Sequence, residues 1–70
     1  MPIYLIADVV ATLIEYADEL KAKSNLDAVE FGTLLGYAEA LSIIHDVCSP
    51  EQLEELGLNF DVDARYFLHK

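Results

Sequence analysis

The sequence predicts an all-α fold: an antiparallel helical hairpin, a short third helix and a C-terminal strap. Apolar residues recur at three- and four-residue steps through two long segments, and two N-terminal capping signatures divide the chain. Seventy residues allow one domain, residues 1–70, and a chain this short buries barely enough apolar surface to offset its conformational entropy. With Cys48 as the single cysteine no internal disulfide is possible. A metal or a second subunit is therefore the expected support.

The first helix is expected over residues 3–23. Pro2 suits its first turn, and Lys21 and Lys23 would complement the helix dipole in its last turn. One stripe is apolar and is expected to face the core: Ile6, Val9, Val10, Leu13, Ala17 and Leu20. The opposite side is acidic and forms a candidate partner-binding face: Asp8, Glu15, Asp18 and Glu19.

The second helix is expected over residues 28–47. Asp27 is a strong N-cap residue, and Glu30 at the third helical position completes a capping box. Leu26 and Phe31 occupy the positions of the matching hydrophobic staple. The connection to the first helix is short, which predicts an antiparallel hairpin.

The second helix is apolar nearly all the way round. One broad face contains Phe31, Leu34, Ala38, Leu41 and Cys48, and a second contains Val29, Gly32, Gly36, Ala40, Ile43 and Val47. A glycine inside a helix costs about 1 kcal/mol relative to alanine. Gly32 and Gly36 therefore indicate that another helix approaches closely at this face, or else that the second helix is itself weak or kinked. Because the first helix has one apolar stripe, it can cover only one of the two faces. The second face is therefore predicted to be the interface of a homodimer with a four-helix core, unless the C-terminal tail covers it.

A third, short helix is expected over residues 50–56. Ser49 is its N-cap, Pro50 its first residue and Gln52 its third, which together form another start signature. Gly57 follows as a natural C-terminal cap.

The tail, residues 58–70, carries a mixed pattern. Alternating apolar residues favour an extended strap: Phe60, Val62, Ala64, Tyr66 and Leu68. Asp61 or Asp63 could equally cap a short terminal helix. We expect an extended stretch followed by one or two helical turns, docked on the helical core because so apolar a tail is poorly suited to water.

The sequence His45-Asp46-x-Cys48 is the one cluster of residues typical of site chemistry. All three side chains can ligate a transition metal, but the only other histidine is His69, at the chain end. A Cys48–His45 nucleophile would lack an orienting third group and an oxyanion site. A histidine at the edge of the core and an inert thiol explain the cluster better, so no catalytic residue, metal or cofactor is expected.

The net charge is −9, from thirteen acidic residues against four basic ones. Direct binding to nucleic acid or to an anionic membrane is therefore not expected, because both need clustered lysine and arginine. A short apolar stretch without a basic leader, and apolar runs far below a membrane span, predict a cytoplasmic protein.

Two functions fit this composition. The first is a small, acidic, non-enzymatic protein-interaction module, a regulator or adaptor that acts as a homo-oligomer and binds an unidentified protein, with a basic partner allowed but not required. The alternative is an acidic inhibitor or decoy, of the kind small phage or plasmid proteins provide, that blocks the basic site of a nucleic-acid-handling protein. The total charge of a dimer is sufficient for such mimicry. However, Asp8 and Glu15 lie about 10 Å apart along their helix, a wider spacing than that of the phosphate charges along DNA.

Overall fold

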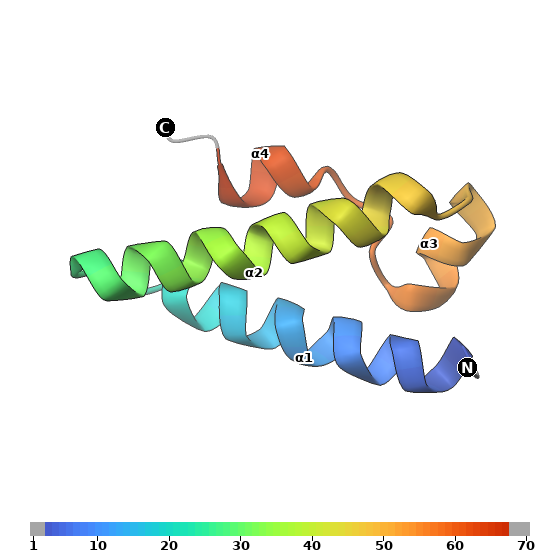
Figure 1. Ribbon diagram of the computed structural model, residues 1–70, viewed down its shortest axis with the longest axis horizontal. Helices are drawn as coiled ribbons and strands as arrows, with labels where there is room; N and C mark the ends of the chain where they lie inside the picture. Colours follow the sequence, from blue (N-terminus) through green and yellow to red (C-terminus); the bar gives the residue numbers. More distant parts are fainter. Residues whose placement is uncertain (1–2, 68–70) are drawn as a thin grey trace.

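The structure, a computed structural model, describes the backbone of residues 3–67 and the side chains of residues 5–67. Within this range the chain forms four helices and no strand: α1 (Ile3–Lys21), α2 (Ala28–Val47), α3 (Pro50–Leu56) and α4 (Val62–Tyr66). α1 and α2 make an antiparallel hairpin, α4 lies along α2 on the side away from α1, and α3 closes one end (Figure 1). The predicted all-α hairpin with a short third helix is confirmed, while its pairing into a four-helix core remains a prediction.

Both predicted helix starts have the expected caps. The Asp27 carboxylate accepts from the Glu30 N–H at 2.7 Å, and the Glu30 carboxylate accepts from the Asp27 N–H at 3.2 Å. At α3 the Ser49 hydroxyl accepts from the Gln52 N–H at 3.2 Å, and the Gln52 amide oxygen accepts from the Ser49 N–H at 2.8 Å. Each box satisfies two backbone donors at the junction, so the starts of α2 and α3 are fixed by local chemistry.

α1 ends at Lys21, two residues before the expected end. The N–H of Lys23 donates to the carbonyl of Leu20, three residues back, at 3.1 Å. This bond tightens the last turn and releases the chain from the α-helical path. The Lys23 side chain then pairs with Glu30 in the first turn of α2, and its hydrogen bond helps hold the pKa of Glu30 below its usual value.

The segment between α3 and α4, residues 57–61, is not helical, and the buried side chain of Leu58 anchors it. Gly57 ends α3 with φ 71°, in the left-handed region that glycine adopts without strain. Leu58 is completely buried, and its N–H donates to the carbonyl of Leu53 at 2.8 Å. The chain therefore turns back toward the hairpin directly after α3.

The described part of the tail contains the short helix α4, whose start the Asp61 side chain caps by accepting from the Ala64 N–H at 3.1 Å. Val62 and Tyr66, one helical turn apart, are both buried, whereas Ala64 between them is exposed. Helical spacing therefore decides which side chains are buried here, and the strand-like alternation does not. Leu68, the last member of that pattern, lies outside the described residues, as does His69.

The core draws on all four helices and the segment before α4. Its buried residues are Val10, Ala17, Leu34, Ala38, Leu41, Leu56, Leu58, Val62 and Tyr66. Val9, which the sequence pattern assigned to the core stripe of α1, is 56% exposed. The apolar stripe is wider than the contact with α2, so its edge remains in solvent. No helix within residues 3–67 combines the length and the apolar character needed to cross a membrane.

Candidate interaction surfaces

α2 has three sides, and only two of them are packed within the chain. α1 covers one side and α4 another, where the Ser42 hydroxyl donates to the Asp63 carboxylate at 3.4 Å (Figure 1). On the third side Val29 is 77%, Ile43 66% and Val47 78% exposed. The described part of the tail, residues 58–67, therefore docks on α2, and these residues leave this side uncovered.

The two glycines of α2 lie on this uncovered side. The helix runs without interruption from Ala28 to Val47, so the glycines do not break it. A Cβ atom added at Gly32 or at Gly36 would meet nothing within 4 Å. No contact within the described chain therefore requires either residue to lack a side chain.

The uncovered surface continues onto α1. Leu5 is 45%, Val9 56% and Tyr16 47% exposed, and the Tyr16 ring contacts the ring of Tyr37 on α2, with centroids 5.9 Å apart. A groove of about 350 Å³ runs between the two helices, with Val9, Leu13 and the two tyrosines among its lining residues. We define the open face as Val29, Gly32, Gly36, Ala40, Ile43 and Val47 of α2 with Leu5, Val9 and Tyr16 of α1. The sequence analysis identified the α2 part. It missed the α1 part because Val9 was assigned to the core stripe, while Leu5 and Tyr16 were assigned to no surface.

Asp18 of the predicted acidic face has a role inside the chain. The Arg65 side chain donates to it through Nε at 3.2 Å and through Nη2 at 2.6 Å, and the Tyr66 hydroxyl donates at 2.7 Å. This cluster joins α1 to α4. Asp8, Glu15 and Glu19 are exposed on α1, and a partner for them remains a prediction.

The Asp18 cluster shifts the titration of its members. Burial raises the pKa of the Asp18 carboxyl, but the hydrogen bonds from Arg65 and Tyr66 outweigh it and hold that pKa below its usual value. Burial first, and then the hydrogen bond to Asp18, raise the pKa of Tyr66 to about 12. The cluster is therefore fully formed at neutral pH, with Asp18 ionised and Tyr66 protonated.

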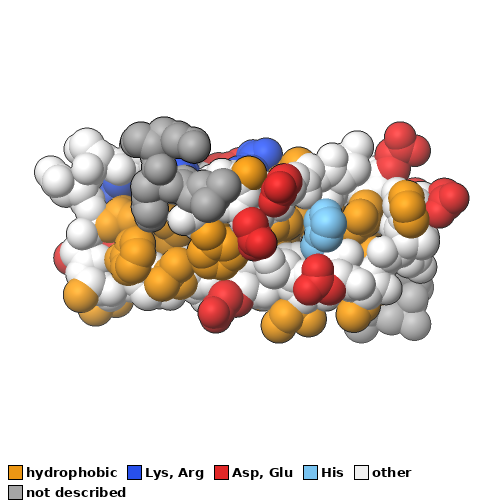
Figure 2. All heavy atoms as spheres, turned by 90° about the horizontal axis from the view of Figure 1, so that it is seen from above, with side chains coloured by type: hydrophobic (Ala, Val, Ile, Leu, Met, Phe, Trp, Pro, Cys, Tyr) orange, Lys and Arg blue, Asp and Glu red, His pale blue; other side chains and the backbone are white. Residues whose placement is uncertain are grey.

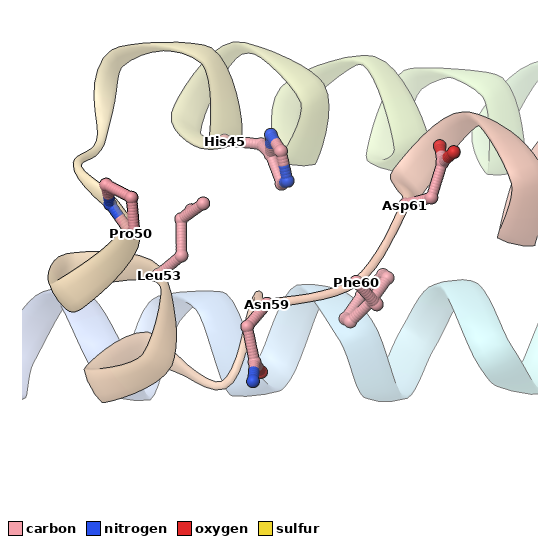
Figure 3. Close-up of a pocket in the computed structure, with 6 residues that line it drawn as sticks. All are labelled: His45, Pro50, Leu53, Asn59, Phe60 and Asp61. Carbon is pink, nitrogen blue, oxygen red and sulfur yellow. The ribbon is translucent and has the colours of Figure 1, made fainter.

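A second candidate surface is a hollow between the end of α2, α3 and the segment before α4. It has a volume of about 590 Å³ and is lined by His45, Pro50, Leu53, Asn59, Phe60 and Asp61. Figure 3 shows His45 and Leu53 projecting toward one another from α2 and α3, with Phe60 on the far side. We call this the α3 hollow. It forms because the chain leaves α3 at Gly57 and returns to α2 only at Asp61.

The structure separates the residues of the His45-Asp46-x-Cys48 cluster. His45 lines the α3 hollow and, with Asp46, an adjoining smaller hollow of about 130 Å³. Cys48 is partly buried beside the core and lines neither. Among the side chains of residues 5–67, no group of three or more His, Cys, Asp or Glu could hold a metal ion. His45 therefore takes part in a surface that the sequence did not indicate.

Comparisons with protein-family models, with curated proteins and with solved structures found no match to this chain. The features that bear on function are therefore those of the chain itself: the open face, the acidic residues and the α3 hollow.

Proposed function

We propose that this chain is a small non-enzymatic protein-interaction module, a regulator or adaptor, that acts as a homodimer paired through the open face. The exposure of that face carries the proposal. Leaving Ile43 or Val47 in water forgoes about 1.5–3 kcal/mol for each side chain relative to full burial. This is a large share of the 5–15 kcal/mol by which small proteins are stable.

The size of the open face suits a second copy of the chain. The molecule measures 36 × 22 × 16 Å, so the rectangle that bounds one of its long sides has an area of about 600–800 Å², which leaves room for an interface approaching the ~800 Å² of accessible surface that each partner contributes to a standard one. A two-fold axis would set α2 against α2 of the second copy, with the two α1 helices alongside. The result is a four-helix core with both α4 helices on the outside.

The glycines support this geometry. Each costs about 1 kcal/mol relative to alanine within a helix, and among residues 3–67 neither Gly32 nor Gly36 has a neighbour that would exclude a Cβ. Small residues at every fourth position let two helix backbones approach closely. A facing α2 gives both glycines a packing role that the single chain does not.

Sedimentation equilibrium with a matched pair of variants tests the proposal. We expect wild type to sediment as a dimer at micromolar concentration and Gly36→Leu to sediment as a monomer, because the added side chain separates the paired helices. The control is Ala11→Leu, which adds the same side chain to an exposed position of α1, roughly 140° around the helix from Tyr16 at ~100° per residue. It should remain a dimer.

Two results would contradict the dimer. One is a wild-type chain that sediments at its 7.8 kDa monomer mass and still unfolds cooperatively. The other is dissociation of Ala11→Leu and Gly36→Leu to the same extent. Circular dichroism of each variant establishes that the helices are intact, which is expected because a Cβ at Gly36 meets no atom of its own chain.

A further inference from the structure

We propose that the α3 hollow docks a basic peptide segment bearing large apolar side chains, supplied by a protein partner. The inference rests on the proposed interaction function and names the chemistry of the partner. It uses a surface distinct from the open face, so the dimer and the docking site can fail independently.

The floor of the α3 hollow is apolar and held in place. Leu53 and Phe60 are partly buried against the core, and Pro50 forms one wall. The guanidinium of Arg65 lies 4.5 Å above the Phe60 ring, and Tyr66 meets that ring edge-on with centroids 6.5 Å apart. The aromatic floor at Phe60 and the wall at Pro50 are therefore ordered before a ligand binds, and this order lowers the entropic cost of binding.

The volume suits an anchoring side chain. Binding pockets commonly measure about 300–1,000 Å³, with apolar walls and a few polar groups that set orientation, and the hollow measures about 590 Å³. The lining residues with polar side chains are His45, Asn59 and Asp61. In Figure 3 the His45 ring projects into the hollow, whereas the side chains of Asn59 and Asp61 point away from its centre. Asp61 also caps α4 through one oxygen, so its charge is fixed at the rim.

The surroundings of the hollow are acidic. Asp61 lines the hollow, and Asp46 and Asp63 line the adjoining smaller hollow with it. Three further carboxylates are exposed on α3: Glu51, Glu54 and Glu55. None of them takes part in an ion pair among the described residues, where the two pairs are Lys23–Glu30 and Arg65–Asp18. The α3 end of the molecule, at the right in Figure 2, shows red and orange side chains and no blue ones.

Arg65 does not offset this charge. It stacks on Phe60, but its guanidinium binds the Asp18 carboxylate through two hydrogen bonds. The negative field therefore favours lysine or arginine on the ligand and repels phosphate. A peptide with an apolar anchor flanked by cations can pack its apolar side chain on the floor and place its positive charges near the acidic rim.

Three synthetic heptapeptides separate the contributions: KKLFKKL, its apolar-free analogue KKSSKKS and its acidic analogue EELFEEL. Each is titrated into the full-length ¹⁵N-labelled protein and followed by amide chemical shifts. KKLFKKL should shift amides around the hollow, and each analogue should bind at least about ten-fold more weakly, a difference of about 1.4 kcal/mol. Absence of binding by KKLFKKL up to millimolar concentration would overturn the site, whatever the oligomeric state.

A matched pair of charge variants tests the location. Asn59→Lys places a cation at the hollow, whereas Asn25→Lys makes the same charge change in the exposed loop between α1 and α2. Asn59→Lys should weaken KKLFKKL about five-fold or more through like-charge contact, and Asn25→Lys by less than about two-fold. Equal weakening by both variants, or equal binding of KKSSKKS, would indicate only the long-range attraction expected of an electrostatic decoy and would overturn the proposal.

Discussion

The packed and the open sides of α2 differ in their neighbours more than in their own residues. Leu34 and Leu41 are buried by helices of the same chain, while Ile43 and Val47, of similar size and polarity, remain in solvent. α1 presents one apolar stripe, and α4 has only five residues, so together they cover two sides of a helix that is apolar on three. An apolar residue on α2 is thus core or surface according to what the rest of the chain can reach.

The largest expected effect comes from testing this contrast directly. Leu41→Ala removes a completely buried side chain and should lower the free energy of unfolding by about 2–5 kcal/mol. Ile43→Ala should change the free energy of unfolding of the isolated monomer by only about 0.5 kcal/mol, while it weakens self-association. Urea unfolding of both variants in the Gly36→Leu background measures the stability of the monomer without the contribution of self-association. Equal losses of unfolding free energy in that background would contradict the distinction between the packed and the open side of α2.

The Asp18 cluster should give the next largest effect. Tyr66→Phe keeps the buried ring but removes the donor to Asp18, and should cost about 1–2 kcal/mol, as expected for a hydrogen bond to a charged group that is partly exposed. This loss of stability should be confined to α4. It would show that polar contacts help to hold α4 against the packed side of the hairpin, whereas the open face has no such contacts among the described residues. Hydrogen exchange of the α4 amides measures it, and unchanged exchange rates would argue against this role.

The same cluster predicts a pH dependence. Because folding raises the pKa of Tyr66 to about 12, the stabilisation is complete below the usual tyrosine pKa of about 10 and is lost as the pH rises toward 12. Folding lowers the pKa of Asp18, so its contribution is present above the usual carboxyl range and is lost as the pH falls through the folded value. Melting temperatures of wild type should decline between pH 10 and 12, and Tyr66→Phe should decline less.

Alanine substitutions at Gly57 and Gly36 should change stability in opposite directions, and Gly36→Ala should give the smallest effect of all. Gly57→Ala forces a side chain into the left-handed region and should cost about 1–2 kcal/mol. Gly36→Ala has helical geometry and open space around the new Cβ, so it should stabilise the monomer by up to about 1 kcal/mol. Thermal unfolding of each in the Ile43→Ala background, where the dimer is weakened, gives the sign; a destabilised Gly36→Ala monomer would mean that the glycine serves the single chain.

Local signals in the sequence predicted much of the fold. The boxes at Asp27 and Ser49 use residues three apart, so both helix starts could be derived without knowing the tertiary structure. The tail could not, because Asp61 and Asp63 are equally good caps by type, and only the packing of Val62 and Tyr66 decides between them.

The candidate sites divide in the same way. The α2 part of the open face follows from helical periodicity alone, since a one-sided α1 cannot reach it. The role of Asp18 depends on residues 47 and 48 positions away, and the α3 hollow depends on the path of the chain after Gly57. Both come from long-range geometry, which a pattern within a single helix does not contain.

The contact between Asp18 and Arg65 also orders the folding of the chain. The α1–α2 hairpin can form outward from the short connection between its two helices, whereas the Asp18–Arg65 contact joins residues 47 positions apart, and such non-local closure carries the larger entropic cost. We therefore expect the hairpin to form first and α4 to dock last. By the same reasoning α4, which has only five residues, should be the first element to open in native-state fluctuations, exposing the Asp18 side of α1 while the hairpin stays folded.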